Sequence, residues 1–449
     1  MIIFATEIAF YMNKNFLTLI CALITICSFV RTADEKVGAM MNDGKWFELR
    51  EFYESKPDSV HPFIDVFGKA MLAHFFNQPE KSVEYCSSLL NDPQIDLANV
   101  ASVGMLMCSD ISKLGDNEQA AQTLEAIDTS IKPYYQHLDS TIIAAIKTDI
   151  AKYKALSSYK VNELKPFDSN ISIPFRLIAI GADSLKQEAV NIDGHINGHT
   201  CQMTFDTGAG VNVISDSLAK ALGLDIVDID LPAVGIGMQS AKLAVVKDLT
   251  IGDLTIYNVP FYVMTLLSGN AEADLYMRHF QIVVGRNIME TVKYLTIDFQ
   301  NKAIVVMKES DIPITAKSNL CLGGSGIYKL LCHTFDGIPM VLNPDTGDAS
   351  FGVLYNNMAS VIGKSRSLQL ASKKMRMAGA GGVLESQYYD VINMPLSIGD
   401  VSATIPQMSL LTSEEPNNSE YDGRIGLASF MLFKSVSFDL SRMIMHAKK

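Results

Sequence analysis

The sequence predicts a multidomain protein in which an N-terminal all-α domain of helical hairpins precedes a mainly-β region of two pseudo-symmetric lobes. Two observations predict this arrangement. Apolar residues recur at helical spacing from about residue 35 to residue 160. Beyond residue 173, a set of landmarks occurs twice in the same order. The chain has 449 residues, 48% of them hydrophobic and 19% charged, so it is long enough for two or three domains with sizeable cores.

The first 33 residues are typical of a signal peptide or a lipoprotein signal. A charge-free apolar run extends from Phe16 to Val30 and follows a single lysine. This run is shorter than the roughly 20 apolar residues that a membrane span needs. Translation starting at Met1 and at Met12 both remain open, and so does lipid attachment at Cys27. We therefore expect export to the periplasm, the outer membrane or the extracellular space, with membrane association only through a lipid anchor.

Residues 34–160 predict a separate helical domain. Its apolar positions define several helices, including one from about Asn99 to Leu114 and one from Asn117 to Ile131. Similar polar turns recur about 38 residues apart, a spacing that resembles tetratricopeptide-type repeats. An irregular helical bundle fits the pattern equally well. Such a domain would either bind a protein partner or brace the rest of the chain.

The duplicated region is built around Asp-Thr-Gly. The tripeptide occurs at Asp206-Thr207-Gly208 and again at Asp345-Thr346-Gly347. Nine residues before each Asp stands a dipeptide that favours a tight hairpin turn, Asn197-Gly198 in the first copy and Asp336-Gly337 in the second. Because one tripeptide is a weak signal, these surroundings give the pair its meaning.

Three further landmarks follow each Asp. They are a Gly-rich segment, an apolar closing segment that ends in Gly, and a strand that ends in an acidic residue. In the first copy these are Gly235-Ile236-Gly237, Val283-Val284-Gly285 and Thr296-Ile297-Asp298. In the second they are Gly379-Ala380-Gly381-Gly382, Ile425-Gly426 and Ser437-Phe438-Asp439. The distance from the Asp to the closing Gly is 79 residues in one copy and 81 in the other. Landmarks in one order at nearly constant spacing indicate an internal duplication.

These landmarks resemble the aspartic peptidases, and in particular the retropepsin-like lobe of the bacterial aspartyl protease family. The resemblance implies an acid-protease fold with lobe 1 over residues 173–315 and lobe 2 over residues 321–449. Both lobes lie in one chain, as in the fused, pepsin-style arrangement. The implied activity is that of an aspartic-type endopeptidase, a hydrolase that acts on peptide or protein substrates.

Two carboxylates account for the chemistry. When two such groups lie about 3 Å apart they share a proton, so that one acts as base toward a water molecule while the other acts as acid. Asp206 and Asp345 are the candidate catalytic residues. The resemblance further implies that Thr207, Gly208, Thr346 and Gly347 support the catalytic loops. It places a substrate-binding flap at Gly235, Ile236 and Gly237 and another at Gly379, Ala380 and Gly381.

The second copy departs from the pattern at three places. Pro344 precedes Asp345, and a proline there removes a backbone donor from a buried strand. Asp348 stands where the first copy has Ala209, and a further carboxylate there disturbs the shared proton if it faces the pair. The Arg-Asn pair that follows Gly285 is replaced by Leu-Ala. The alternative function is that of a catalytically impaired peptide-binding or assembly protein that retains the fold but has lost hydrolysis through the changes at Pro344 and Asp348.

Composition excludes other classes. The net charge of −12 argues against nucleic acid as a partner. Spacings typical of zinc ligands do not occur, so we expect neither a metal nor a cofactor. The seven cysteines include two in the N-terminal segment, and for the others disulfides and buried free thiols both remain open. We expect Gly323 to Gly326 to form a linker or turn, and Asp298 and Asp439 to be structural, each ending a strand where solvent begins.

Overall fold

The structure is a computed structural model, and it describes most of the chain from Thr32 onward. The described residues are 32–55, 60–180, 187–235, 237–267, 270–271, 274, 277–334, 337–365, 373–379, 382–412 and 420–449. The segment predicted as a signal therefore lies almost entirely outside them. The chain forms two compact units, one helical and one rich in β-strands, and their boundary along the sequence falls between Lys160 and Val161.

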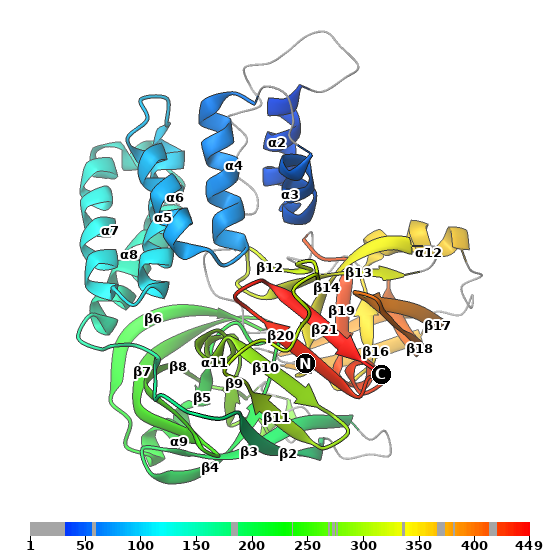
Figure 1. Cartoon of the computed structure of the whole chain (residues 1–449). Coiled ribbons are helices and arrows are strands. Elements are labelled where there is room, and N and C mark those ends of the chain that lie inside the picture. Colours follow the sequence, from blue (N-terminus) through cyan, green and yellow to red (C-terminus); the bar gives the residue numbers. More distant parts are fainter. Residues whose placement is uncertain are drawn as a thin grey trace. The chain divides into compact units, whose positions relative to one another are not determined.

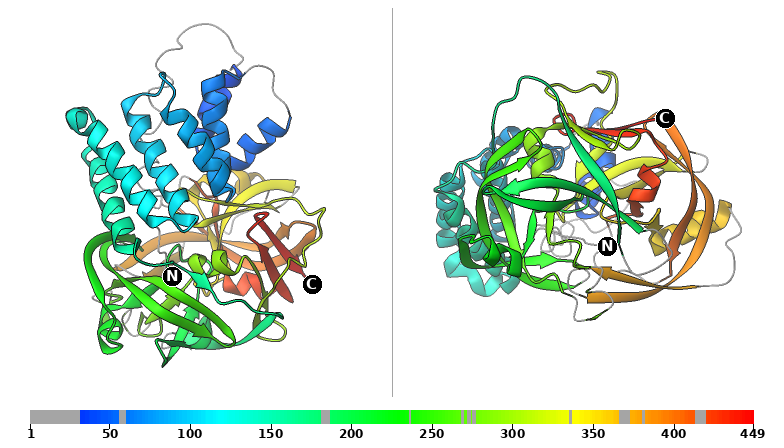
Figure 2. Two further views of the ribbon diagram at one scale, coloured as in Figure 1. Left: turned by 60° about the vertical axis from the view of Figure 1, so that its left-hand side comes forward. Right: turned by 90° about the horizontal axis from the view of Figure 1, so that it is seen from below.

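Helices α4 to α7 of the first unit each pack against the next helix along the chain, as Figures 1 and 2 show. The elements are α2 (Ala33–Asn42), α3 (Trp46–Glu54), α4 (Pro62–Phe75), α5 (Pro79–Leu90), α6 (Leu97–Lys113), α7 (Asn117–Ile131), the 3-10 turn η2 (Lys132–His137) and α8 (Ser140–Leu156). The two helices that periodicity predicted at about 99–114 and 117–131 are α6 and α7. No helix in the described part of the chain combines the length and apolarity needed to cross a bilayer.

Side-chain caps explain where several of these helices begin. Thr32 and Glu35 exchange hydrogen bonds in a capping box at the start of α2. Asp96, Asp116 and Asp139 each accept a hydrogen bond from a backbone N–H in the first turn of α6, α7 and α8. These carboxylates satisfy amides that otherwise have no partner within the helix. The sequence thus sets the register of the apolar faces that pack together.

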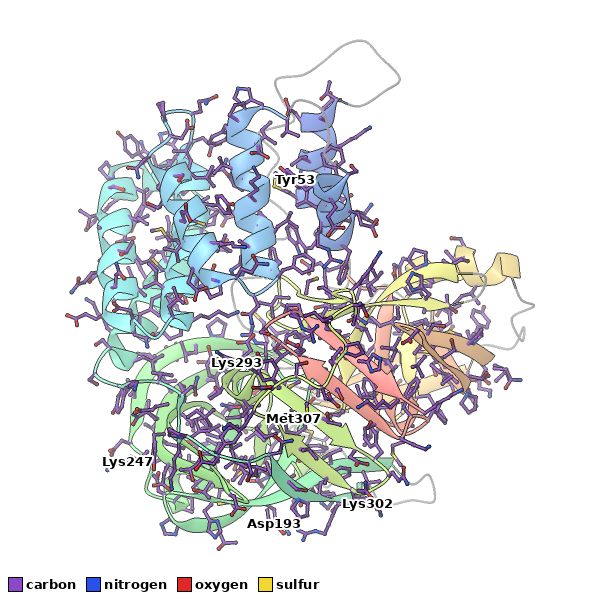
Figure 3. All side chains as sticks on the ribbon, in the orientation of Figure 1. Tyr53, Asp193, Lys247, Lys293, Lys302 and Met307 are labelled. Carbon is purple, nitrogen blue, oxygen red and sulfur yellow. The ribbon has the colours of Figure 1, made fainter. Side chains whose placement is uncertain are left out.

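The first helices of this unit pack closely. Trp46 of α3 stacks on Phe75 of α4 with ring centroids 3.9 Å apart. Tyr53, labelled in Figure 3, donates a hydrogen bond of 3.4 Å to the carbonyl of Asp65. A Cβ at Gly68 would lie 2.5 Å from the Tyr53 hydroxyl oxygen, so the glycine makes room for the ring. Small and aromatic residues are therefore matched across this contact.

We describe the β-rich unit in two parts. Its first half contains β1 (Glu163–Leu164), β2 (Ile171–Ile180), β3 (Gln187–Ile196), β4 (His199–Phe205), β5 (Val213–Ser215), α9 (Asp216–Ala221), β6 (Ile226–Val234), β7 (Met238–Ile251), β8 (Leu254–Met264), β9 (Ile282–Val284), α11 (Arg286–Val292), β10 (Tyr294–Asp298) and β11 (Ala303–Val306). Its second half contains β12 (Leu320–Leu322), β13 (Tyr328–Thr334), β14 (Ile338–Asp345), β15 (Gly352–Leu354), η4 (Asn356–Met358), α12 (Ala359–Ser365), β16 (Lys373–Gly379), β17 (Gly382–Ile398), β18 (Val401–Leu411), β19 (Gly423–Gly426), α13 (Leu427–Phe430), β20 (Ser435–Asp439) and β21 (Ile444–Lys448).

The two halves have strands in matching order. In the first half the order is β4-β9-β5-β8-β7-β6, and in the second it is β14-β19-β15-β18-β17-β16. β4 and β14, which lead to the Asp-Thr-Gly segments, each run parallel to the strand that ends at the closing glycine, β9 or β19. That strand in turn runs antiparallel to β5 or β15, which follows the Asp-Thr-Gly loop. Each Asp-Thr-Gly loop is thus held between the same two neighbours.

The halves also join directly through a shared sheet. β10 of the first half pairs antiparallel with β20 of the second, so that Thr296 lies opposite Ser437. Figure 1 shows the hairpin β20–β21, in red, beside β10. The hydroxyl oxygens of Thr296 and Ser437 are 2.7 Å apart and buried. These two residues occupy corresponding positions in the duplicated landmarks, so the strands meet at equivalent points.

The acidic residues that end these two strands are structural for a reason other than the predicted one. Asp298 accepts hydrogen bonds from the backbone and side chain of Asn301. Asp439 accepts a hydrogen bond from the backbone N–H of Arg442 and is paired with its guanidinium. Asp439 is fully buried, so it does not mark the point where solvent begins. Both carboxylates instead stabilise the turns that follow the strands.

The turn before the first Asp-Thr-Gly forms as predicted. Asn197 and Gly198 lie between β3 and β4 with φ of 49° and 81°. Positive φ at both positions is the requirement of a type I′ hairpin. In the second copy Gly337 also has a positive φ, 76°, whereas Asp336 lies outside the described residues. The predicted turn at Gly323 to Gly326 follows β12 and is closed by a hydrogen bond of 2.9 Å between the ends of that segment.

Candidate active site

β4 delivers Asp206 to the centre of the β-rich unit. The last three residues of this strand are buried, and it lies parallel to β9 with Phe205 opposite Val284. The backbone N–H of Asp206 donates a 2.9 Å hydrogen bond to the carbonyl of Val284. The chain then turns, because the N–H of Ala209 donates to the carbonyl of Asp206 at 3.2 Å. The apolar strand and its closing partner therefore fix where this carboxyl lies.

β14 delivers Asp345 in the same way. Pro344 lies opposite Ile425 of β19, and the N–H of Asp348 donates to the carbonyl of Asp345 at 3.3 Å. The carbonyl of Asp348 accepts from Leu427, as the carbonyl of Ala209 accepts from Arg286 in the first half. Asp348 is thus the structural counterpart of Ala209. Leu427 replaces the first-half arginine without loss of this backbone bond.

The two threonines form four buried hydrogen bonds between the two segments. The N–H of Thr207 donates to Thr346 Oγ1, and the N–H of Thr346 donates to Thr207 Oγ1, both at 3.0 Å. Thr207 Oγ1 donates to the carbonyl of Pro344 at 2.8 Å, and Thr346 Oγ1 donates to the carbonyl of Phe205 at 3.1 Å. Each hydroxyl both donates and accepts across the pair. The structure therefore brings Thr207 and Thr346 together as the resemblance implied.

These bonds explain why a proline is tolerated before Asp345. The residue at this position supplies its carbonyl to the opposite threonine, and proline retains its carbonyl. Phe205 supplies the same group in the first half. Proline lacks the N–H, but the interaction that links the two segments uses the carbonyl of this residue.

Gly208 and Gly347 bring backbone amides to the carboxyls. The N–H of Gly208 donates to Asp206 Oδ1 at 2.8 Å, and that of Gly347 donates to Asp345 Oδ1 at 2.9 Å and to Asp206 Oδ1 at 3.2 Å. Neither glycine has a left-handed φ. Space is the reason for glycine here: a Cβ on Gly347 would lie 2.3 Å from Asp206 Oδ2, and one on Gly208 would lie 2.5 Å from Asp345 Oδ1. Each glycine lies against the carboxyl of the opposite half.

The carboxyls of Asp206 and Asp345 are both fully buried. The Oδ2 atoms of both residues have no hydrogen-bond partner among the described residues. Burial raises the pKa of Asp206 well above its ordinary value, and the charge of Asp345 raises it further. Burial also raises the pKa of Asp345, although a nearby arginine opposes this. Such a pair holds a proton at pH values where an exposed aspartate is ionised.

Arg424 is the arginine beside Asp345. It lies in β19, is 1% exposed, and places its Nε 3.5 Å from Asp345 Oδ2 and 2.7 Å from Asp348 Oδ2. Asp348 Oδ1 accepts hydrogen bonds from the N–H and the hydroxyl of Ser350. Burial raises the pKa of Asp348, but Arg424 and these donors outweigh burial and hold this pKa below its ordinary value. The extra carboxylate is therefore part of a buried ion pair.

Sequence reasoning missed Arg424 and also Asn212. The signal for Arg424 was its position, because it is a charged residue inside the closing segment Gly423-Arg424-Ile425-Gly426. The carboxylate of Asp348 needs such a cation nearby in space. Asn212 follows the first Asp-Thr-Gly loop, and its side chain accepts from the N–H of Gly285 and donates to the carbonyl of Pro260, both at 3.2 Å. It ties the first loop to the closing glycine.

The residues assigned to flaps lie at the ends of two long hairpins. Gly235 and Gly237 connect β6 and β7, and the N–H of Gly235 donates to the carbonyl of Gly237 at 3.0 Å. Gly379 ends β16 and pairs with Gly382 of β17. Ile236, Ala380 and Gly381 lie outside the described residues. Whether these segments bind substrate stays a prediction.

Among the described residues, no group of three or more His, Cys, Asp or Glu side chains is placed to hold a metal ion. The five cysteines of the described part of the chain are buried and form no disulfide with one another: Cys86, Cys108, Cys201, Cys321 and Cys332. The interpretation as buried thiols therefore holds for these residues.

Comparison with known proteins gave a family match over part of the first half of the β-rich unit. Residues 192–288 match the family model described as "Aspartyl protease". The match spans the strands from β3 to β9 and includes Asp206, and it supports aspartic protease activity. A retropepsin-like aspartic protease from Rickettsia conorii, known from its crystal structure, is 16% identical, with 32% of this chain and 95% of that chain covered and a TM-score of 0.20. A search of curated proteins gave no match.

Proposed function

We propose that this protein is an aspartic endopeptidase in which Asp206 and Asp345 act together on one water molecule. The observation that carries the proposal is that the two buried carboxyls each lie against the glycine of the opposite Asp-Thr-Gly segment, and that the N–H of Gly347 donates to Oδ1 of both. The reciprocal threonine bonds hold this contact in place. The family match over residues 192–288 supports the same activity.

The chemistry follows from the shared proton. Two carboxyls in contact do not both ionise, because the second charge is opposed by the first and by burial. The ionised member accepts a proton from water, whose oxygen attacks the peptide carbonyl carbon. The protonated member donates a hydrogen bond to the carbonyl oxygen as negative charge develops there. The Oδ1 atoms accept hydrogen bonds from glycine amides, whereas the Oδ2 atoms have no hydrogen-bond partner among the described residues.

The substrate in this proposal is an extended peptide or protein segment. It would pair its backbone with the hairpins β6–β7 and β16–β17, which carry the glycines assigned to the flaps. Met238, at the start of β7, is 65% exposed and offers an apolar side chain close to the tip of the first hairpin. Side-chain pockets would then set the cleavage preference.

We further propose that the β-rich unit arose by duplication into two lobes. The matching strand order of the two halves, the paired Thr296 and Ser437, and the reciprocal hydrogen bonds of the two threonines support this. The helical unit remains a candidate binding domain of tetratricopeptide type. Export rests on the apolar N-terminal segment alone, and cell fractionation tests it: recovery of the protein in the cytosol at full precursor mass would contradict it.

Cleavage of a diverse peptide library by the purified protein, from pH 3 to pH 8, tests the proposed activity. We expect cleavage by the wild-type protein, and no cleavage by Asp206→Asn or Asp345→Asn. Asp193→Asn provides a matched control, because Asp193 of β3 (Figure 3) forms an exposed ion pair with Arg176 of β2. Cleavage that survives in both Asp206→Asn and Asp345→Asn would show that another site is responsible. Peptide binding without cleavage by all the proteins would favour the non-catalytic alternative.

A further inference from the structure

The two aspartates of the proposed pair stand in different electrostatic surroundings. In the second half, Arg424 and Asp348 form a buried ion pair beside Asp345. In the first half the counterparts of these residues are Val283 and Ala209. The correspondence follows from strand register, because Val283 lies opposite Thr204 just as Arg424 lies opposite Asn343, two residues before each Asp. A neutral pair of small side chains on one side is thus replaced by a charged pair on the other.

Arg424 is held so that its charge acts on Asp345. Its Nε lies 2.7 Å from Asp348 Oδ2 and 3.5 Å from Asp345 Oδ2, and the residue is 1% exposed. Asp348 is fixed in turn by Ser350, which donates from both its N–H and its hydroxyl to Oδ1. The charged or titratable groups of the described residues that face Asp345 are Asp206 from the opposite loop, Asp348 from its own loop and Arg424 from β19. Arg424 is the cation among them.

We propose that Arg424, oriented by Asp348, is a positioning residue that makes Asp345 the ionised member of the pair and leaves the shared proton on Asp206. A cation at 3.5 Å in a water-excluded site favours the charged form of the carboxyl that it faces. In the half that carries Asp206, the positions that correspond to Asp348 and Arg424 hold the uncharged residues Ala209 and Val283. In this arrangement Asp345 accepts the proton of the attacking water, and Asp206 donates the hydrogen bond to the substrate oxygen. The inference rests on the proposed function, which by itself leaves the two roles interchangeable.

The direction of the pKa values agrees with this geometry. Burial raises the pKa of both aspartates, but the charge of Asp345 adds to this for Asp206, whereas Arg424 opposes it for Asp345. The charge of Asp348 raises the pKa of Asp345, whereas Arg424 lowers it, so the two members of the ion pair have opposite effects on this pKa. Removing Asp348 alone and removing both charges therefore have opposite consequences for Asp345.

A titration that needs no catalysis provides the first test. Aspartate labelled with 13C at the carboxyl carbon is incorporated into the full-length Asp206→Asn and Asp345→Asn variants, and the remaining carboxyl of the pair is titrated by NMR. We expect Asp345, in the first variant, to titrate at lower pH than Asp206 in the second. The gap is expected to shrink when both variants also carry Asp348→Ala and Arg424→Val, which reproduce the first-half pair. Equal titration of the two carboxyls, or a gap unchanged by the added substitutions, would overturn the proposal.

The pH dependence of kcat/KM provides the second test. In Asp348→Ala, Arg424 faces Asp345 without its counter-ion, and we expect the acidic limb to move down by about one pH unit. In Asp348→Ala/Arg424→Val the limb is expected to move back up, to the wild-type position or above it. The isosteric Asp348→Asn serves in place of Asp348→Ala if the latter does not fold. Acidic limbs that coincide in all these proteins would overturn the inference while leaving the peptidase intact. A wild-type protein that does not cleave, with unequal carboxyl titrations, would instead refute the proposed function.

Discussion

The contact between each glycine and the opposite carboxyl gives the structure's sharpest prediction. In Gly347→Ala the new Cβ would lie 2.3 Å from Asp206 Oδ2 and 2.5 Å from its Cγ. Ordinary contacts between such atoms are about 3.5 Å, so the Asp206 carboxyl or the loop must move by roughly 1 Å. Overpacking of this kind costs about 1–3 kcal/mol of stability. A displacement of about 1 Å at a reacting group lowers the rate by roughly 100-fold.

The assay compares Gly347→Ala with Gly194→Ala. A Cβ at Gly194 would lie 2.6 Å from the carbonyl oxygen of Thr250, so this variant suffers a similar clash in the β3–β7 contact, away from the pair. Stability is measured by urea unfolding and kcat/KM with a cleaved peptide, per folded molecule. We expect both variants to lose stability and Gly347→Ala alone to lose activity. Activity of Gly347→Ala within about threefold of the control would refute the reasoning, because a 1 Å shift of a catalytic carboxyl costs roughly 100-fold.

Three further predictions concern the groups around the pair. Thr207→Val keeps the shape of the side chain but leaves the N–H of Thr346 and the carbonyl of Pro344 without their buried partner. We therefore expect the free energy of unfolding, measured in urea, to fall by about 2–4 kcal/mol. Thr207→Ser keeps the hydroxyl and should retain most of the stability. Arg424→Val leaves Asp348 charged and buried and should cost about 3–5 kcal/mol, while Asp348→Ala/Arg424→Val should unfold near the wild-type midpoint; equal losses would contradict this. Because the pKa of Asp206 is raised by folding, its contribution to stability is present below the unfolded pKa of about 3.9 and declines as pH rises toward the folded pKa. The stability of Asp206→Asn relative to wild type should therefore increase between pH 4 and pH 7, and a constant or falling difference would show that the carboxyl is not held protonated.

The backbone around the site follows from local sequence signals. Asn197 and Gly198 specify the turn before Asp206, because both positions need a positive φ. The apolar residues of β4 bury one carboxyl-bearing loop, and the repeated landmarks place a second loop at the same point of the second half. The sequence therefore predicted which two aspartates meet. It did so because the repeated landmarks place the two aspartates at matching points of the two halves, an arrangement that resembles the aspartic peptidases.

The surroundings of Asp345 were not predictable in the same way. Asp348 and Arg424 are far apart in the chain, and their pairing depends on the parallel register of β14 and β19, which no local pattern specifies. The role of the Pro344 carbonyl was not predictable, because the position of this residue along the strand does not reveal that its carbonyl accepts from Thr207. Gly208 and Gly347 were expected to support the catalytic loops, but the sequence did not show that glycine is required there by the closeness of the opposite carboxyl. Each of these features is a contact between distant segments.

A double-mutant cycle on the two aspartates tests the central claim most directly. The values of kcat/KM for the wild-type protein, Asp206→Asn, Asp345→Asn and the double variant are measured with one cleaved peptide. If the carboxyls act as one unit on a single water, each single substitution removes nearly all of the catalytic effect and the double variant is no slower than either. Losses that multiply in the double variant, or a single variant that keeps substantial activity, would contradict a shared catalytic pair.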